Sequence, residues 1–136
     1  MTGLSRVHVL VGLIADGQGR WLVNRRRAGT HMAGLWEFPG GKSHLGEAPF
    51  ATLHRELGEE LGIDVQDAEA WFELVHDYED KRVRLDIWRV LRYEGEVTAR
   101  EGQLLRWVTV DEFAGLPLLP ADWPIVERLR NQQTAS

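Results

Sequence analysis

A group of glutamates between Gly41 and Gly62 most constrains what this chain can fold into. The group comprises Glu56, Glu59 and Glu60, and residues spaced i, i+3 and i+4 on a helix project from one face. Three carboxylates packed this closely repel one another, so the pKa of at least one of them should be raised. A divalent cation would relieve the repulsion, and the spacing therefore predicts a metal site on a helix.

The same segment carries the pattern of a helix with a buried side. Phe50, Leu53, Leu57 and Leu61 recur at helical spacing and form an apolar stripe beside the acidic one. A fully solvated helix would leave this stripe unexplained, together with the excess of negative charge on the other face. We therefore expect a helix over about residues 48–61 that packs its apolar stripe against a core.

The ligand types around the glutamates favour a hard cation. The chain has no cysteine and five histidines, and His8, His44 and His54 have no carboxylate or cysteine partner at ligand spacing. Carboxylates in this setting suit Mg²⁺, with Mn²⁺ as the alternative, rather than Zn²⁺. Such a cation is the usual partner of a phosphate chain and lowers the pKa of a bound water. From the residues alone, we expect metal-assisted hydrolysis of a phosphate-containing substrate.

Residues 41–63 match the Nudix box at each of its fixed positions, and residues 31–42 resemble the MutT branch of the Nudix hydrolases. The segments 100–103 and 120–124 also resemble that branch, so the resemblance extends over nearly the whole chain. It implies an α/β fold in which a mixed β-sheet is sandwiched between helices, an α/β/α sandwich, as one domain over residues 1–136. It also implies a nucleoside triphosphate pyrophosphohydrolase that releases a nucleoside monophosphate and pyrophosphate.

The resemblance also implies a set of metal ligands. Most of them belong to the box, and one lies far along the chain in an Arg-Glu-Gly-Gln segment. The implied ligands are the backbone carbonyl of Gly41 and the carboxylates of Glu56, Glu59, Glu60 and Glu101. The last of these would be an outlying ligand or would assist the base.

Catalytic roles follow from the same match. Either Glu56 or Glu101 would be the general base, and the sequence leaves this choice open. Arg55 would hold the catalytic helix and its loop together by pairing with a neighbouring glutamate such as Glu47 or Glu59. As an ordinary surface pair, Arg55 and Glu59 would contribute well under about 1 kcal/mol.

Three residues outside the box would contact the substrate: Arg26, Phe38 and Asp122. Arg26 stands where relatives contact the phosphates, and a guanidinium suits bidentate phosphate contacts. Phe38 would line the base pocket, and a place in the apolar core is an equal alternative. Close relatives often have an asparagine at the position of Asp122, whereas an ionised aspartate only accepts hydrogen bonds. If buried, Asp122 would stay protonated and donate; its other interpretation is an N-cap for the last helix.

The departure at Asp122 leaves the nucleobase open. One hypothesis is the removal of oxidised nucleotides such as 8-oxo-dGTP, which is a DNA repair role, and another is a pyrophosphohydrolase of CTP or dCTP. ADP-ribose and dinucleoside polyphosphates are further Nudix substrates to consider. A non-catalytic nucleotide sensor is the alternative of a different class, and the intact box favours an enzyme over it.

Charge and composition limit the partners. A formal net charge of −5 and a pI near 5.5 argue against binding to a nucleic acid polymer, whose protein partners are basic. No apolar run approaches the length that spans a bilayer, so no membrane partner is expected. The lack of cysteine and of a signal-like N-terminus predicts the cytoplasm. The expected partner is the nucleoside triphosphate substrate, with the protein a monomer or a homodimer.

The order of the predicted elements is that of an α/β protein. Strands are expected at residues 7–14, 21–25, 70–79, 82–93 and 105–110, with the third and fourth paired antiparallel. The Pro-Gly-Gly segment before the glutamate helix is typical of a turn. A final amphipathic helix is expected from about Asp122 to Arg130, followed by a frayed polar tail.

Overall fold

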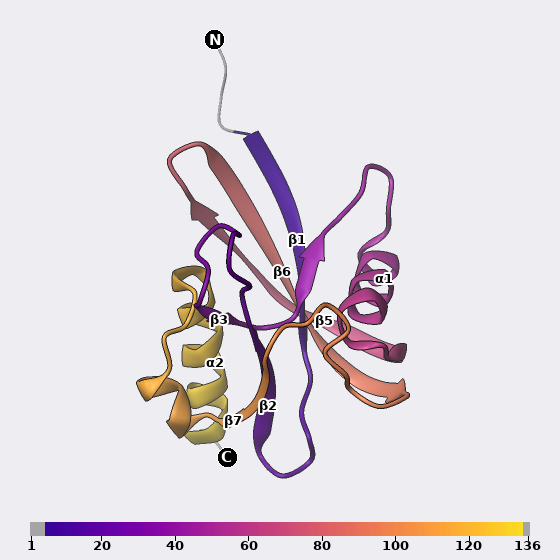
Figure 1. Ribbon diagram of the computed structural model, residues 1–136, viewed down its shortest axis with the longest axis vertical. Helices are drawn as coiled ribbons and strands as arrows, with labels where there is room; N and C mark the ends of the chain where they lie inside the picture. The colour runs from indigo at the N-terminus through magenta and orange to yellow at the C-terminus, as the bar shows by residue number, and fades with distance from the viewer. Residues whose placement is uncertain (1–4, 135–136) are drawn as a thin grey trace. The chain divides into compact units, whose positions relative to one another are not determined.

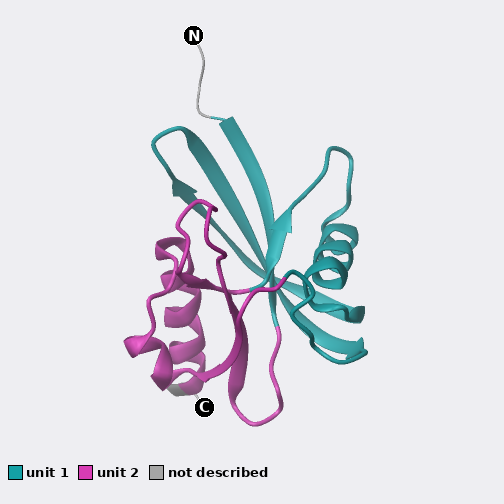
Figure 2. Cartoon of the chain, in the orientation of Figure 1, with its two compact units in different colours: residues 1–13, 39–101 teal, residues 14–38, 102–136 magenta. Residues whose placement is uncertain are grey.

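The computed structural model describes residues 5–134, and the chain divides into two compact units, which Figure 2 colours separately. Unit 1 comprises residues 1–13 and 39–101, and unit 2 comprises residues 14–38 and 102–136. Each unit has its own β-sheet, and Figure 1 labels their elements. One domain over the whole chain stays a prediction.

Unit 1 is built on a four-stranded mixed sheet in the order β4-β1-β6-β5. Its strands are β1 (Ser5–Leu13), β4 (Gly40–Lys42), β5 (Asp64–Asp77) and β6 (Lys81–Glu94). β1 runs parallel to β6 and antiparallel to β4. β5 and β6 are antiparallel over almost their whole length, which confirms the predicted pairing of these strands.

Two strands of unit 1 differ from the sequence prediction. β5 begins at Asp64 rather than near residue 70, and β4 forms where a turn was expected. The start of β5 has no clean alternation of buried and exposed residues, because its register with β6 shifts between Val65 and Asp67 and again before Ala68. β4 contains two glycines, which weaken a strand on propensity grounds, and pairing with β1 overrides that preference.

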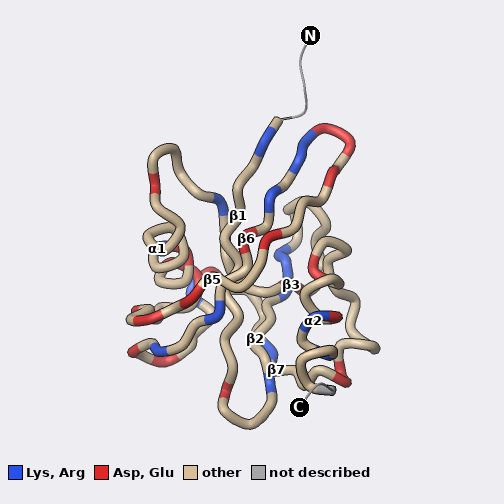
Figure 3. Tube along the Cα trace, turned by 180° about the vertical axis from the view of Figure 1, so that it is seen from behind, with Lys and Arg blue, Asp and Glu red and all other residues tan. Residues whose placement is uncertain are grey.

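Helix α1 (Pro49–Leu61) confirms the predicted helix. Leu53, Leu57 and Leu61 are fully buried, as the apolar stripe required. Burying each of these side chains contributes about 1.5–3 kcal/mol. Phe50 was expected in the same stripe but is 36% exposed, since it lies in the first turn of the helix. The acidic residues of α1 are marked in red in Figure 3.

Unit 2 contains a three-stranded antiparallel sheet in the order β3-β2-β7. The strands are β2 (Arg20–Arg25), β3 (Trp36–Glu37) and β7 (Leu105–Thr109). The long loop between β2 and β3 is closed by backbone bonds from Arg26 to Leu35 and from Gly34 back to the Arg26 carbonyl. The loop therefore has a defined base beside β2.

The C-terminal part of unit 2 is helical. Two 3-10 turns, η1 (Asp111–Gly115) and η2 (Pro120–Asp122), precede helix α2 (Trp123–Thr134). α2 begins one residue later than predicted and continues through residues 131–134, so the prediction of a frayed tail was wrong for these four residues. Residues 135 and 136 of the predicted tail lie outside the described residues. Neither α2 nor another helix in the described range 5–134 is long and apolar enough to cross a membrane.

We predict that Gly40 is essential for the packing of β4. Its φ of 152° is unfavourable for other residues, and a Cβ atom there would collide with the Leu10 carbonyl oxygen. Replacing Gly40 by Ala should therefore lower the free energy of unfolding by more than about 2 kcal/mol, measured by urea denaturation. Gly46→Ala is the matched control, because Gly46 has a φ of 79° with open space around it. Equal losses in the two variants would contradict the steric argument.

Candidate active site

Two glycines hold β4 against the acidic face of α1. A Cβ atom on Gly41 would overlap the carboxylate of Glu56, so a side chain at this position would displace that carboxylate. One residue earlier, the Gly40 N–H donates to Oε2 of Glu60 at 3.0 Å. Glu60 is only 8% exposed, and burying its carboxylate without such a donor would be costly. Two of the three glutamates predicted as ligands therefore lie against β4.

Arg55 joins three parts of unit 1. Its Nε donates to Oε2 of Glu47 at 2.8 Å, and its Nη2 donates to the backbone carbonyl of Lys42 at 3.0 Å. Its Nη1 donates to Oε1 of Glu56 at 2.9 Å and lies 3.4 Å from Oε2 of Glu59. The predicted pairing of Arg55 with a neighbouring glutamate is confirmed, and one guanidinium connects β4, the loop before α1 and the acidic face of α1.

Arg55 and Glu47 shift the pKa values of one another strongly. The Arg55 hydrogen bonds hold the pKa of Glu47 well below its usual range, helped by the backbone N–H of His44 and the Thr52 hydroxyl. Glu47 in turn raises the pKa of Arg55. Both groups therefore stay charged. Because Glu47 is the main partner of Arg55, it compensates much of the guanidinium charge that would otherwise stabilise the other carboxylates.

Burial and like charge act together on Glu56. Burial is the largest cause that raises the pKa of this carboxyl, the hydrogen bond from Arg55 lowers it, and the negative charges of Glu59 and Glu101 raise it further. The net pKa is raised, as the helical spacing predicted, although burial rather than repulsion is the main cause. A group with a raised pKa among like charges is one that a cation would stabilise.

Glu101 reaches this region because its segment is attached to the end of α1. The Thr98 N–H donates to the carbonyl of Leu61 at 2.9 Å, and the Arg100 N–H donates to the carbonyl of Glu60 at 3.1 Å. These bonds satisfy carbonyls at the C-terminal end of the helix, which would otherwise lack partners. The sequence could not show this attachment, because the two segments are about 40 residues apart.

The carboxylates of α1 fit a divalent cation in their chemistry. They are hard oxygen ligands, and the negative charges of Glu59 and Glu101 raise the pKa of Glu56. The carboxylate oxygens of α1 are, however, less tightly grouped than the ligand atoms of another cluster in unit 1. In the described residues, the group whose three ligand atoms all lie within 4.8 Å is His8, Glu73 and Asp86 on the sheet. The α1 glutamates are instead directed to Arg55 and to the backbone of β4.

Arg26, in unit 2, is held by a carboxylate that the sequence did not single out. Its Nη1 donates to both carboxylate oxygens of Glu37, at 2.8 and 3.2 Å, and its Nε donates to the His31 carbonyl at 2.6 Å. Burial raises the pKa of Glu37, while the Arg26 guanidinium opposes that rise. Arg26, flanked by Arg25 and Arg27, also lines a cavity of about 620 Å³ in unit 2.

Asp122 is a buried acid, 3% exposed. Its Oδ2 accepts a hydrogen bond from the Phe38 N–H at 3.0 Å. Burial raises the pKa of Asp122 to about 7, the Phe38 N–H lowers it, and the charge of Glu37 raises it further. The prediction that burial would raise this pKa is confirmed. This hydrogen bond joins Asp122 to the residue that follows β3, and the role of Asp122 as an N-cap of α2 stays a prediction.

The Phe38 side chain lies in the apolar interior. It is 3% exposed, and its ring centroid is 5.5 Å from that of Phe113 at a tilt of 44°. This is the core position that was predicted as the alternative to a substrate contact. Its backbone N–H, rather than its ring, makes the polar contact of this residue with Asp122. A contact of Phe38 with substrate stays a prediction.

The family described as NUDIX domain matches residues 10–128 of this chain. The chain belongs to the Nudix family. An 8-oxo-dGTP diphosphatase of Escherichia coli is 34% identical over 127 residues, which is 93% of this chain and 98% of that protein. A CTP pyrophosphohydrolase of the same organism is 36% identical over 118 residues, covering 87% of each.

Solved structures agree with the Nudix fold. The solution structure of the E. coli ORF135 protein has a TM-score of 0.84 and 33% identity, covering 97% of this chain and 94% of that one. A MutT structure from a study of Aliivibrio salmonicida and Vibrio cholerae has a TM-score of 0.81 and 31% identity, with coverage of 94% and 99%. The predicted α/β Nudix fold and the similarity to the MutT branch are confirmed.

Two histidines have carboxylate partners that their spacing in the sequence did not reveal. His8 Nε2 lies 3.1 Å from Oδ2 of Asp86, and His54 Nε2 lies 2.8 Å from Oδ1 of Asp64. The sequence hides the first pair because 78 residues separate its members, which only the parallel pairing of β1 and β6 brings together. Glu37 was missed for a similar reason: nothing local reveals its bond to Arg26.

We predict a pH-dependent stability that arises from Asp122. Below the ordinary aspartate pKa, at about pH 4, both the folded and the unfolded chain carry this carboxyl protonated. As the pH rises from about 4 to about 7, the unfolded chain ionises this carboxyl while the folded chain keeps it protonated, so stability falls; above about pH 7 both forms are ionised and stability levels off. Relative to Asp122→Asn, whose amide oxygen can still accept from Phe38, the wild type should lose on the order of a few kcal/mol across this range.

Urea unfolding of both proteins at a series of pH values measures this difference. The asparagine variant serves as the reference because every other titrating group is shared. Parallel curves for the two proteins between pH 4 and pH 8 (about the range set by the two pKa values) would show that Asp122 does not titrate inside the fold.

Proposed function

We propose that this chain is a metal-dependent nucleoside triphosphate pyrophosphohydrolase that releases a nucleoside monophosphate and pyrophosphate. The observation that carries the proposal is the acidic face of α1, where Glu56 and Glu60 lie against the two glycines of β4. Membership of the Nudix family supports it. So do relatives named 8-oxo-dGTP diphosphatase and CTP pyrophosphohydrolase, which this chain matches over most of their length.

We propose Mg²⁺ as the cation, with Mn²⁺ as a substitute, because hard oxygen donors make up the set. The residues that would hold it are the Gly41 carbonyl and the carboxylates of Glu56, Glu59, Glu60 and Glu101. When bound, the cation supplies neutralisation of phosphate charge and a lower pKa for a coordinated water.

The protein groups around this set have separate tasks. Glu56 or Glu101 would accept the proton of the attacking water, since both are carboxylates in the same acidic region. Arg55 would act as a positioning residue. Its bonds to Glu47 and Lys42 keep the loop before α1 attached to the helix, and this fixes where the glutamates stand.

Arg26 and Asp122 would contact the nucleotide. The bonds recorded for Arg26 in the described residues use its Nε and Nη1, which leaves Nη2 for a phosphate oxygen, and the arginine-lined cavity suits an anion. Asp122, with a pKa near 7, can be neutral or ionised at neutral pH. It would therefore donate to or accept from a base edge. Phe38 would contribute to the base pocket mainly through its backbone.

The preferred nucleobase separates two versions of the proposal. The first is 8-oxo-dGTP, and hydrolysis of it would give the enzyme a role in DNA repair. The second is CTP or dCTP, because an ionised aspartate can accept from the exocyclic amine of cytosine, as it can from that of guanine. ADP-ribose and dinucleoside polyphosphates remain further alternatives, as does a sensor without activity. The cytoplasmic location and the monomer or homodimer stay predictions.

Steady-state hydrolysis of 8-oxo-dGTP, dGTP, CTP, dCTP and ADP-ribose, with the products identified, distinguishes these versions. We expect a monophosphate and pyrophosphate from at least one triphosphate, and a kcat/KM preference that identifies the base. In the same panel, Asp122→Asn should change the ratio between bases more than it changes the Mg²⁺ requirement. Equal losses on every nucleotide would contradict a base-reading Asp122, and hydrolysis of ADP-ribose alone would overturn the triphosphate proposal.

We predict that Glu60→Gln lowers kcat by at least about a hundredfold, which is the loss of several kcal/mol of metal-dependent stabilisation. The substitution is isosteric, and the amide oxygen can still accept the Gly40 N–H, so the fold should survive. Glu69→Gln, an exposed position on β5, is the control and should leave kcat unchanged. A folded Glu60→Gln protein with near-normal turnover would remove Glu60 from the metal set.

A further inference from the structure

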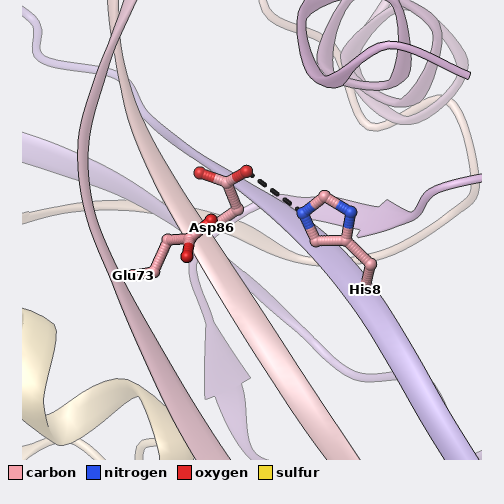
Figure 4. A group of neighbouring side chains, drawn as sticks. All are labelled: His8, Glu73 and Asp86. Carbon is pink, nitrogen blue, oxygen red and sulfur yellow. Dashed lines mark hydrogen bonds and ion pairs between the residues drawn. The ribbon is translucent and has the colours of Figure 1, made fainter.

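Three side chains with metal-ligating atoms meet on the sheet of unit 1. His8 of β1, Glu73 of β5 and Asp86 of β6 each contribute one such atom, and these atoms all lie within 4.8 Å of one another. Figure 4 shows the His8 imidazole directed at the Asp86 carboxylate, with Glu73 beside it. None of the three belongs to the Nudix box.

The strand register explains why these three residues meet. Glu73 lies directly opposite Asp86 in the antiparallel pair of β5 and β6, and Leu10 lies opposite Asp86 in the parallel pair of β1 and β6. His8 is two residues before Leu10, so its side chain is on the same face of the sheet. Three neighbouring strands therefore present one ligand each from a regular backbone.

Asp86 is buried and already oriented. It is 6% exposed. The Trp88 Nε1–H donates to its Oδ1 at 2.8 Å, and its Oδ2 lies 3.1 Å from Nε2 of His8. Metal-binding carboxylates are commonly fixed by a hydrogen bond of this kind to their second oxygen. The free rotation of the carboxylate is thus already lost before any ion binds.

The charges of this cluster are incompletely balanced. Two carboxylates directly opposite on neighbouring strands repel one another, and one of them, Asp86, is buried. Nη2 of Arg84 contacts Oε1 of Glu73 at 3.2 Å, but both of these side chains are about half exposed to solvent. His8 is charged only when it is protonated. A divalent ion would neutralise both carboxylates while His8 stays neutral.

We propose that His8, Glu73 and Asp86 form a second metal site, for Zn²⁺. One imidazole nitrogen and two carboxylate oxygens are ligands that Zn²⁺ accepts, with water in the open position. Mg²⁺ prefers oxygen ligands, so the imidazole favours a transition metal over it. The bound ion would link β1, β5 and β6.

This site is separate from the carboxylates of α1. Gly41, Leu10 and Asp86 form one row across β4, β1 and β6, so Asp86 is two strand spacings, about 10 Å, from Gly41. A single ion cannot use both sets of ligands. The second site is also independent of the proposed hydrolase activity, because zinc binding can be measured without a nucleotide.

Calorimetric titration of the full chain with Zn²⁺, in an excess of Mg²⁺, tests the proposal. The wild type should bind one Zn²⁺ that His8→Asn and Glu73→Gln each weaken by at least about tenfold. His54→Asn is the matched control: His54 also pairs with an aspartate, Asp64, but does not belong to the three-ligand cluster. It should bind Zn²⁺ as the wild type does.

Thermal unfolding supplies the second readout. Zn²⁺ should raise the Tm of the wild type and of His54→Asn but raise that of His8→Asn less, since an ion stabilises the folded state according to how tightly it binds that state. The proposal is overturned if the wild type binds no Zn²⁺ in excess Mg²⁺. Zinc binding that is the same in His8→Asn as in the wild type, or equally weakened in His54→Asn, would also overturn it.

Discussion

The close approach of β4 to α1 is the constraint on which the candidate active site depends. At Gly41 the strand lies so near the helix that a Cβ atom would occupy the space of the Glu56 carboxylate. At Gly40 the backbone N–H donates to Glu60. Only because β4 is this close can Arg55 reach both the Lys42 carbonyl and the glutamates of its own helix. A side chain at Gly40 would therefore push against the backbone of β1, and one at Gly41 would displace the Glu56 carboxylate that the proposed chemistry needs.

Charge in this region is arranged for binding rather than for stability alone. Arg55 is shared among Glu47, Glu56 and Glu59, and Glu47 receives the strongest part of that interaction. Glu56 is left partly buried with a raised pKa beside two further carboxylates. Natural proteins keep such unfavourable groupings mainly at functional sites. A cation that compensates the repulsion connects the fold of unit 1 with the proposed hydrolysis.

The local features of this site could be predicted from the sequence, and the long-range ones could not. Helix α1, its three buried leucines and its acidic face follow from spacings within one helix. The contact of Gly41 with Glu56 joins residues 15 apart, and its steric tightness is visible only in the structure. The start of β5 was hidden by register shifts that break the alternation of its residues.

Polar partners from distant strands were the least predictable. Glu37 meets Arg26 through the pairing of β2 and β3, and Asp86 meets His8 through the parallel pairing of β1 and β6. Neither contact leaves a pattern in the sequence, because the periodicity of a strand indicates which face of the sheet a residue occupies but not which residue of a neighbouring strand lies beside it. The sequence predicted a protonated Asp122 only if this residue were buried. The structure shows that it is buried and that the Phe38 N–H donates to it.

The most direct test is to measure whether α1 holds a divalent cation. Free Mn²⁺ can be followed by electron paramagnetic resonance while the wild type, Glu59→Gln and His8→Asn are titrated. Glu59 is the best position to change, because its side chain is 54% exposed and its one recorded contact with Arg55 is long. We expect Mn²⁺ binding to be weakened at least about tenfold in Glu59→Gln and retained in His8→Asn. Unchanged binding in Glu59→Gln would contradict a metal site on the acidic face of α1.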